Sequence, residues 1–345
     1  MQNLDWGSLG FSYTKTNYNV RAVYRDGAWG EIEVSDSEYI PMHIAASCLH
    51  YSQEAFEGLK AYRGVDGKVR MFRVDENGKR LQRSAEYLCM AVPPIELFVE
   101  ACRKVVELNM DFVPPYGSGA TLYLRPLLIG TSPQLGVGPT KEYTLIVFAS
   151  PVGPYFKSGF KPIQVMIDRD HDRAAPKGTG HVKAGGNYAA SIYSGVQAHD
   201  KGFANVIYLD AAERKYIEEC GAANFFGIKE GKYVTPLSGS ILPSITNMSL
   251  RQIAEDMGLT VEQRNIPVEE LPTFDEVGAC GTAAVISPIG KIYDPVSGET
   301  LVYGDGTEAG EMSVKMYNEL RGIQFGEVED RHGWCTIIEG QALDV

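Results

Sequence analysis

Residues 178–188 have the sequence GTGHVKAGGNY, in which a single lysine, Lys183, lies among four glycines. Glycines let a backbone approach a ligand closely, and a lysine held in such a place can be desolvated, which lowers its pKa. The opposite interpretation is a solvated lysine on a flexible loop, and the local sequence favours it because lysines are overwhelmingly exposed. Whether Lys183 carries chemistry therefore depends on the rest of the chain.

The part of the chain before this segment ends in a candidate linker at 151–162, where PVGPYFKSGFKP contains three prolines and two glycines. Upstream of it, two stretches rich in β-branched and aromatic residues are expected to be strands, TLYLRPLLIG (121–130) and YTLIVFAS (143–150). Two amphipathic helices are expected to precede them. The length of 345 residues favours two packed domains over one.

Beyond the linker, NYAASIYSGVQAHDKG (187–202) is expected to form a helix with Ile192 and Val196 on one face. GTAAVISPIGKIYD (281–294) is expected to be mostly strand, and a terminal helix is expected at 308–321. Helices and strands do not alternate in the regular βα pattern of a doubly wound sheet. The sequence therefore predicts a mixed α+β fold.

Composition and charge exclude several classes of function. The formal net charge is −12, so the chain has no basic face with which to bind a nucleic acid, and its scattered basic residues do not favour an anionic membrane surface. The start of the chain lacks the features of a secretion signal, and no apolar stretch is long enough to cross a bilayer. The six cysteines form no C-x-x-C pair and indicate reduced thiols in a cytoplasmic protein. No metal-ligand motif, P-loop or G-x-S-x-G occurs.

The helix start at 244–258, SITNMSLRQIAEDMG, is a candidate phosphate site. The backbone N–H groups of Ile245 and Thr246 are unpaired at a helix N-terminus, where an anion binds favourably. Simple N-capping by Ser244 explains the same residues, and alone it is the more probable interpretation. The turn at 281–283, GTA, offers a second set of backbone donors followed by a hydroxyl.

Four charged residues are candidates for ligand binding. Glu219 follows an expected strand, where its carboxylate can pair with a protonated ring nitrogen or simply be solvated. Arg80, Arg125 and Arg173 are each able to clamp an anion through two hydrogen bonds. Arg125 is the most informative, because it interrupts an otherwise apolar strand. Taken singly, each arginine is equally compatible with a surface salt bridge.

Six motifs that occur together along the chain favour a functional interpretation of these residues over an ordinary structural one. They are LHYSQEAFEGLKAYRG, TLYLRPLLIG, HVKAGGNYAAS, EECGAANFF, LPSITNMSL and GTAAVISPIG. From about Trp29 to about Ile323 the chain resembles branched-chain amino-acid aminotransferases, which are pyridoxal-phosphate enzymes of fold type IV. The resemblance implies a smaller α/β N-terminal domain (1–155), an interdomain loop (156–170) and a larger C-terminal domain (171–345) with a pseudo-barrel of strands. It also implies a cofactor at the domain interface and a homodimer.

By the resemblance, Lys183 is the catalytic lysine that forms a Schiff base with pyridoxal 5'-phosphate. Glu219 resembles the carboxylate that pairs with the pyridine nitrogen, and Tyr188 the phenol beside the 3-oxygen of the cofactor. Arg173 and Asn224 resemble residues that support the lysine and the glutamate. The other implied cofactor-binding residues are Arg80, Ala222, Leu242, Ile245, Thr246 and Thr282.

The substrate pocket is implied in the same way. Tyr123 and Arg125 resemble the Y-x-R strand of the family, in which Arg125 is expected to hold the distal carboxylate of 2-oxoglutarate or glutamate. The other implied substrate residues are Tyr13, Phe56, Tyr155, Thr282 and Ala283. The mammalian enzymes carry a C-x-x-C after the GTA turn, but here Ala284 and Ser287 occupy those positions. His181 has no counterpart to which a role can be given.

The implied reaction moves the amino group of leucine, isoleucine or valine to 2-oxoglutarate, or the reverse, by a ping-pong mechanism. The main alternatives share the fold and are D-amino-acid aminotransferase and aminodeoxychorismate lyase. A catalytically silent cofactor-binding or interaction protein is the alternative from another class, although Lys183 and Glu219 are both present. An acidic two-domain hydrolase has no nucleophile and base pair to support it. The expected partners are amino acids and 2-oxo acids, with no nucleic acid and no membrane.

Overall fold

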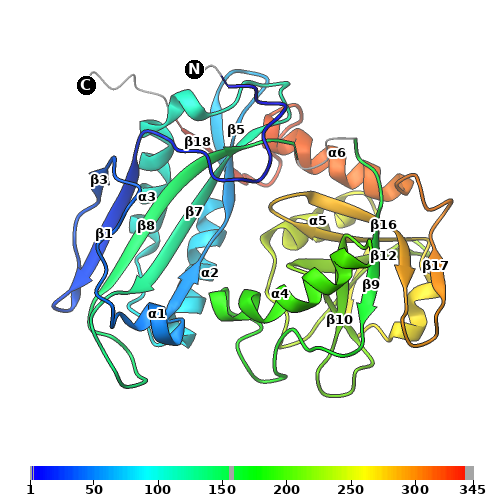
Figure 1. Cartoon of the computed structure of the whole chain (residues 1–345). Coiled ribbons are helices and arrows are strands. Elements are labelled where there is room, and N and C mark those ends of the chain that lie inside the picture. Colours follow the sequence, from blue (N-terminus) through cyan, green and yellow to red (C-terminus); the bar gives the residue numbers. More distant parts are fainter. Residues whose placement is uncertain (1, 3, 155–158, 339–345) are drawn as a thin grey trace. The chain divides into compact units, whose positions relative to one another are not determined.

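The computed structural model describes residues 2, 4–154 and 159–338 (Figure 1). The chain divides into two compact units. The first unit comprises Met1–Tyr155, Val182–Gly185 and Gly322–Val345, and the second unit comprises Phe156–His181 and Gly186–Arg321.

This division differs in three places from the ranges expected from the sequence. Residues 163–168, within the expected interdomain loop, form strand β9 (Ile163–Asp168) of the second unit. The described residues from Gly322 to Ile338 group with the first unit, because strand β18 (Cys335–Ile338) pairs antiparallel with β6 (Val69–Phe72). The segment Val182–Gly185, which carries Lys183, also groups with the first unit.

The first unit is built on a nine-stranded sheet with the order β18–β6–β5–β7–β8–β1–β2, in which β3 also pairs with β1 and β4 with β7. Its remaining strands are β1 (Asn19–Arg25), β2 (Ala28–Trp29), β3 (Glu33–Ser35), β4 (Glu54–Phe56), β5 (Leu59–Arg63), β7 (Thr121–Gly130) and β8 (Tyr143–Val152). The long antiparallel pair β7 and β8 matches the two strands that their β-branched and aromatic residues predicted.

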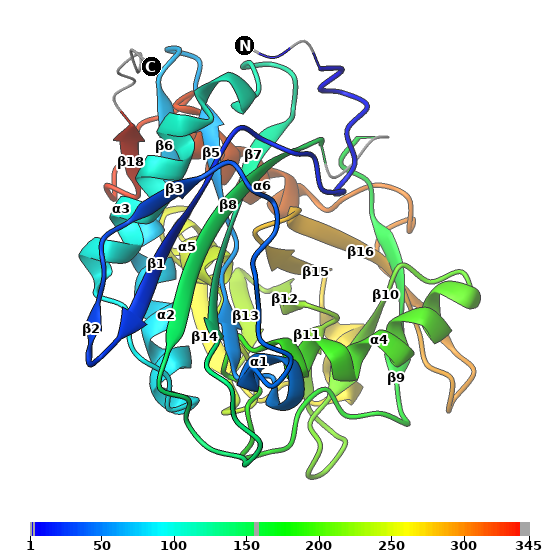
Figure 2. The same ribbon diagram turned by 60° about the vertical axis from the view of Figure 1, so that its left-hand side comes forward.

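Helices α2 (Val74–Tyr87) and α3 (Ile95–Leu108) cover one face of this sheet (Figure 2). The helices of the first unit are α1 (Ser47–Tyr51), α2 (Val74–Tyr87), α3 (Ile95–Leu108) and a short 3₁₀ helix, η1 (Met110–Phe112). Helix α2 contributes Leu81 and helix α3 contributes Phe98 to one core with Leu124 of β7 and Val147 of β8. These apolar positions recur at helical spacing on one side of each helix, which is why that side packs against the sheet.

The second unit contains a closed barrel. Its strands run in the order β11–β10–β9–β16–β15–β12, and β11 also pairs with β12, which closes a ring of six. The strands of this unit besides β9 are β10 (Asn205–Leu209), β11 (Ile217–Cys220), β12 (Ala223–Lys229), β13 (Lys232–Pro236), β14 (Thr260–Arg264), β15 (Glu276–Gly281), β16 (Val285–Tyr293) and β17 (Thr300–Val302). The expected barrel in the C-terminal part of the chain is therefore confirmed.

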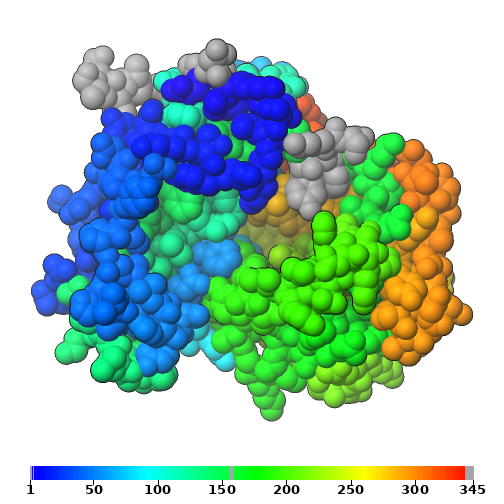
Figure 3. Space-filling view, viewed as in Figure 1, coloured from blue at the N-terminus to red at the C-terminus, as the bar shows by residue number. Residues whose placement is uncertain are grey.

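The helices of the second unit lie close to the ranges predicted from the sequence, but not every side chain expected on an apolar face is buried. These helices are α4 (Gly185–Asp200), α5 (Ile245–Asp256), the 3₁₀ helix η2 (Val268–Thr273) and α6 (Glu311–Phe325), of which Gly185 and residues 322–325 group with the first unit. Helix α4 lies on the surface shown in Figure 3, and its Ile192 and Val196 are exposed by 65% and 51%. Helix α6 begins three residues later than expected and buries Met316 and Leu320.

Candidate active site

Strand β7 carries Tyr123 and Arg125 two positions apart, so both side chains lie on one face of the sheet. Nη2 of Arg125 donates to the Tyr123 hydroxyl over 2.9 Å, and the guanidinium carbon lies 4.9 Å from the centre of the Phe56 ring. Nε of Arg125 is buried and has no hydrogen-bond partner among the described residues. A buried donor left unpaired costs free energy, so this nitrogen is suited to an acceptor supplied by a ligand.

The Tyr123 hydroxyl occupies space that a side chain at Gly58 would need. A Cβ added at Gly58 would lie 2.1 Å from that oxygen. On its other side the Tyr123 ring meets Phe11 edge to face, with ring centres 5.0 Å apart. Tyr13, the substrate residue expected from the sequence, is 58% exposed and donates to Glu38 over 2.8 Å. The expected substrate residue Tyr155 lies outside the described part of the chain.

The backbone of Lys183 is held by two hydrogen bonds within the first unit. Its N–H donates to the Ser84 hydroxyl over 3.1 Å, and its carbonyl accepts from the N–H of Phe56 over 3.1 Å. Its amine nitrogen lies 4.7 Å from the centre of the Phe56 ring. Ser84 lies on α2 four residues after Arg80, and so one helical turn away. The lysine is thus fixed at its main chain and placed beside an aromatic ring.

Arg80 is part of a buried ion pair. Its Nε donates to Oε1 of Glu57 over 2.8 Å, and its Nη2 donates to Oε2 over 2.7 Å. Asn77 donates to the same carboxylate over 2.7 Å. The side chains of Arg80 and Glu57 are exposed by only 6% and 0%, so this is not the surface salt bridge that the local sequence allowed. The arginine is held in place by the carboxylate, and its contact with a phosphate stays a prediction.

In the second unit, Glu219 on β11 is surrounded by donors. Its Oε1 accepts from the N–H of Leu242 over 2.8 Å and from the side-chain amide of Asn224 over 3.3 Å, and its Oε2 lies 3.1 Å from Nε of Arg173. Glu219 is only 2% exposed. Hydrogen bonds and a cation of this kind stabilise the charged form of a buried carboxylate. A carboxylate kept charged in this way fits a protonated pyridine nitrogen.

Arg173 also connects the loops around this carboxylate. Its Nη2 donates to the carbonyl of Gly180 over 2.9 Å and to the carbonyl of Ser240. Gly180 precedes Lys183 by three residues, and Ser240 precedes Leu242 by two. Arg173 thus contacts Glu219 and the segment that leads to Lys183, and its supporting role in a cofactor site stays a prediction.

The start of α5 shows the N-cap by Ser244 that the sequence predicted, and the binding of a phosphate there stays a prediction. Ser244 has an extended backbone, and its hydroxyl accepts from the N–H of Asn247 over 3.1 Å. This bond leaves the N–H groups of Ile245 and Thr246 without an acceptor inside the helix. The other expected cofactor or substrate residues of the second unit lie in turns or at a helix start: Tyr188 in the first turn of α4, Ala222 between β11 and β12, and Thr282 and Ala283 between β15 and β16.

Several residues of the site were not singled out from the sequence. Glu57 lies in the FEGLK part of a quoted motif, and its burial beside Arg80 was the missed feature. Ser84 could have been found one helical turn from Arg80. Phe11 had no signal, because its contact with Tyr123 joins segments more than 100 residues apart.

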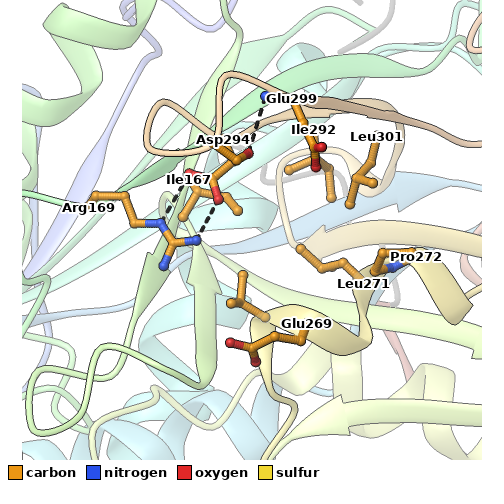
Figure 4. A pocket seen from close by; sticks show the side chains of 11 residues that line it. Ile167, Arg169, Glu269, Leu271, Pro272, Ile292, Asp294, Glu299 and Leu301 are labelled. Atoms are coloured by element: carbon orange, nitrogen blue, oxygen red, sulfur yellow. Dashed lines mark hydrogen bonds and ion pairs between the residues drawn. The ribbon is translucent and has the colours of Figure 1, made fainter.

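A separate pocket of about 210 Å³ lies in the second unit (Figure 4). Apolar residues such as Leu271 and Ile292 line it, together with Arg169 and Asp294. Arg169 donates to the Asp294 carboxylate over 2.6 Å and 3.2 Å, as the dashed lines in Figure 4 show. No residue expected to bind cofactor or substrate lines this pocket. No helix in the described part of the chain is long and apolar enough to cross a membrane.

The second unit has a barrel with a buried carboxylate bound by donors and a helix start suited to phosphate, and the first unit holds a lysine beside an aromatic ring. These features fit an enzyme that uses a phosphorylated pyridine cofactor. The model of the class IV aminotransferase family matches residues 54–292, and the chain belongs to this family.

Individual relatives agree with this assignment. A branched-chain-amino-acid aminotransferase of Haemophilus influenzae is 48% identical, and the match covers 98% of this chain and 100% of that protein. The crystal structure of the Escherichia coli branched-chain amino acid aminotransferase matches with a TM-score of 0.80 and 28% identity, over 94% of this chain and 100% of that one. The T.th. branched-chain amino acid aminotransferase, solved with pyridoxamine 5'-phosphate, matches with a TM-score of 0.76 and 25% identity, over 92% and 98%.

These matches confirm the family expected from the six motifs, the fold type IV architecture, and the assignment as an aminotransferase. They also confirm pyridoxal phosphate as the cofactor.

Proposed function

We propose that the chain transfers the amino group of leucine, isoleucine or valine to 2-oxoglutarate, and catalyses the reverse reaction. The full-length similarity to the Haemophilus influenzae branched-chain-amino-acid aminotransferase carries this proposal. The side chains around Arg125 support it, because they combine an aromatic surface with a buried donor that has no partner in the described chain. Such a pair of features suits both an aliphatic side chain and a carboxylate.

The chain supplies the acid–base groups for this reaction. When bound, the cofactor draws electrons from the substrate Cα so that its proton can be removed. Lys183 would hold the cofactor, and its amine, in the free and neutral form, would accept the proton that leaves the substrate Cα. Glu219 would keep the proton on the pyridine nitrogen of the bound cofactor. The Arg173, Asn224 and Leu242 groups around Glu219 support its charged form for this task.

The chain also binds and orients its ligands. Ile245 and Thr246 offer backbone donors for the phosphate, and Arg80, Thr282 and Leu242 are assigned to the same cofactor. For substrates, burial of an aliphatic chain against Phe56 contributes roughly 1.5–3 kcal/mol. The distal carboxylate of 2-oxoglutarate is assigned to Arg125, where a charge-assisted hydrogen bond replaces the water that is lost on binding.

An optical experiment tests the proposed function. The purified protein should be yellow, should lose that colour when leucine is added, and should regain it with 2-oxoglutarate. Lys183→Ala should still take up pyridoxal phosphate, without the covalent bond, and should lose transamination. Retained turnover in that variant contradicts the assignment of the lysine, and bleaching of the wild type by D-alanine in place of leucine favours the D-amino-acid enzyme.

We further propose that the enzyme is a cytoplasmic homodimer. The first unit exposes large apolar residues on the β7–β8 loop and near α1, with Leu135 at 88%, Val137 at 84% and Ile44 at 84%. Apolar residues gathered on a surface are typical of interaction sites. Light scattering coupled to size-exclusion chromatography should give twice the chain mass. A monomer at micromolar concentration that is fully active contradicts this part of the proposal.

A further inference from the structure

A network of buried polar side chains extends from Glu219 into the second unit. Asn247 Nδ2 donates to Asn224 Oδ1 over 3.2 Å, and Asn224 Nδ2 donates to Glu219 Oε1 over 3.3 Å. Asn247 Nδ2 also donates to Thr235 Oγ1 over 2.9 Å, while the Tyr233 hydroxyl donates to Asn247 Oδ1 over 2.7 Å. None of the five residues exposes more than 8% of its surface. We call these five residues the Asn247 network.

Backbone carbonyls fix the direction of the hydrogen bonds at both ends of this network, because a carbonyl can only accept. At one end, the Thr235 hydroxyl donates to the carbonyl of Phe225 over 2.8 Å, so its oxygen accepts from the Asn247 amide. At the other end, Asn224 Nδ2 donates to the carbonyl of Leu242 over 3.1 Å, so Asn224 Oδ1 faces Asn247. The two ends therefore agree: each requires the side-chain amide of Asn247 to donate its N–H to the side-chain oxygen of Asn224.

Asn247 also links two parts of the cofactor site. It lies in the first turn of α5, directly after Ile245 and Thr246, and its own N–H is bonded to Ser244. Its side chain reaches Asn224, which bonds Glu219. Burial raises the pKa of Tyr233 well above its ordinary value, so the hydroxyl that bonds Asn247 stays protonated over the working pH range.

We propose that Asn247 is a positioning residue that keeps the N–H of Asn224 directed at Glu219, so that this carboxylate stays charged and holds the proton on the pyridine nitrogen. The inference rests on the proposed function, since it concerns the same cofactor. The inference extends the site by one residue. The Asn247 side chain bonds Asn224, which in turn bonds Glu219, so Asn247 acts on Glu219 through Asn224.

Replacing the hydrogen-bond donor of the Asn247 side chain by an acceptor gives the sharpest test. In Asn247→Asp the side chain has nearly the same shape but only acceptor atoms when ionised. It would face Asn224 Oδ1 with like partial charges, which favours rotation of the Asn224 amide. The rotated amide would direct its oxygen at Glu219 and at the carbonyl of Leu242, both of which are acceptors. Glu219 would then lose a donor and hold the ring proton less well.

The readout is the protonation of the cofactor ring. The holoenzyme is prepared with pyridoxal phosphate labelled with ¹⁵N in the ring, and the ring nitrogen resonance is recorded by solid-state NMR. Wild type and Thr235→Ser, which keeps the hydroxyl, should show the protonated pyridinium position. Asn247→Asp and Asn247→Leu should both shift the resonance toward the neutral position, with the larger shift in Asn247→Asp.

Single-turnover kinetics with leucine give a second readout. Both Asn247 variants should slow the conversion by about tenfold or more, as outer-shell hydrogen-bond partners do at metal sites. The leucine concentration giving half the maximal rate should change much less, because no substrate contact is removed. Leu250→Ala, which creates a cavity in the same helix and removes none of the network's side-chain hydrogen bonds, should lower thermal stability and leave the resonance unchanged.

The outcomes separate the inference from the function on which it rests. A wild type that takes up no cofactor or gives no reaction with leucine contradicts the proposed function. A functional wild type whose ring resonance is unchanged in Asn247→Leu overturns the inference alone, and Asn247→Leu introduces no buried charge that would hinder folding. A resonance that shifts equally in Leu250→Ala also overturns it, because the effect would then follow general destabilisation.

Discussion

At Arg125 the structure leaves one buried donor, Nε, without a partner in the described residues. Arg125→Ala should therefore slow the 2-oxoglutarate half-reaction by about 10- to 100-fold, the equivalent of about 1.5–3 kcal/mol for a hydrogen bond to a charged group. The leucine half-reaction should lose much less, because the Phe56 ring that receives an aliphatic chain is retained. Each half-reaction can be followed separately by the absorbance of the cofactor. Equal losses in the two would contradict the assigned role.

Gly58 gives a stability prediction at the same strand pair. In Gly58→Ala the new methyl group would lie 2.1 Å from the Tyr123 oxygen, so the ring must leave its present position, which disturbs its contacts with Phe11 and Arg125. Overpacking of this kind costs about 1–3 kcal/mol, and urea unfolding should show the loss. Gly195→Ala in α4 is the matched control, since nothing lies within 4 Å of the added atom, and it should be neutral or stabilising by up to about 1 kcal/mol. Equal unfolding midpoints would refute the steric argument.

The sequence identified residue types at this scale better than it identified their partners. Arg125 was conspicuous because a charge interrupts an apolar strand. Arg80, in contrast, was compatible with a surface salt bridge until Glu57 proved to be buried against it. Partners such as these come from segments distant in the chain, and only the register of the sheet and the packing of α2 bring them together.

At the scale of elements, the start of α5 was predictable because its signal is local. The Ser244 hydroxyl accepts from the N–H of Asn247 as the capping rule requires. Ser244→Ala should lower the free energy of unfolding by about 1 kcal/mol, and Ser244→Asp should retain most of it. Urea unfolding of the apoprotein measures both. If the alanine variant is as stable as the wild type, the cap does not stabilise the helix.

The closure of the barrel was not predictable in the same way. Strands β7 and β8 were evident from composition, but the pairing of β11 with β12 that closes the ring depends on a turn at Gly221, whose φ is 58°. Gly221 also packs directly against the Asn205 side chain. In helix α4 the sequence pattern predicted more than the structure shows, because Ile192 and Val196 have the spacing of core residues and are nevertheless exposed. Periodicity indicates that a helix has an apolar face and does not say what covers it.

For the whole molecule, local patterns could not assign the last described residues to a unit. Helix α6 ends at Phe325, and the chain then continues to β18, which pairs with β6 more than 250 residues earlier. The aromatic contact between Trp334 and Phe72 and the Arg73 guanidinium over the Trp334 ring reinforce this pairing. A terminal strand that adds to the edge of a distant sheet leaves no trace in the spacing of its own residues, so the sequence-based ranges placed these residues in the second domain.

The acid stability of the molecule depends on charged clusters that join elements. Glu270 of η2 accepts from Arg264 of β14 over 2.5 Å and 2.8 Å and from Lys229 of β12 over 2.5 Å. The hydrogen bonds from Arg264, despite partial burial, lower the pKa of Glu270 from 4.5 to about 2. A carboxyl whose folded pKa is depressed contributes stability above its unfolded pKa and loses it as the pH falls through the folded value. The contribution of Glu270 should thus be complete above about pH 5 and lost toward pH 2.

Glu270→Gln should consequently lower the free energy of unfolding at pH 7 by about 1 kcal/mol, the upper range for ion pairs near the surface. The difference from wild type should shrink steadily between pH 4.5 and pH 2, because protonation removes the same charge in the wild type. Urea unfolding across this range measures the difference. The control is Glu255→Gln, which removes an exposed carboxylate on α5 and should leave the free energy of unfolding at pH 7 close to that of the wild type. A difference for Glu270→Gln that is independent of pH would show that shape, and not charge, makes Glu270 stabilising.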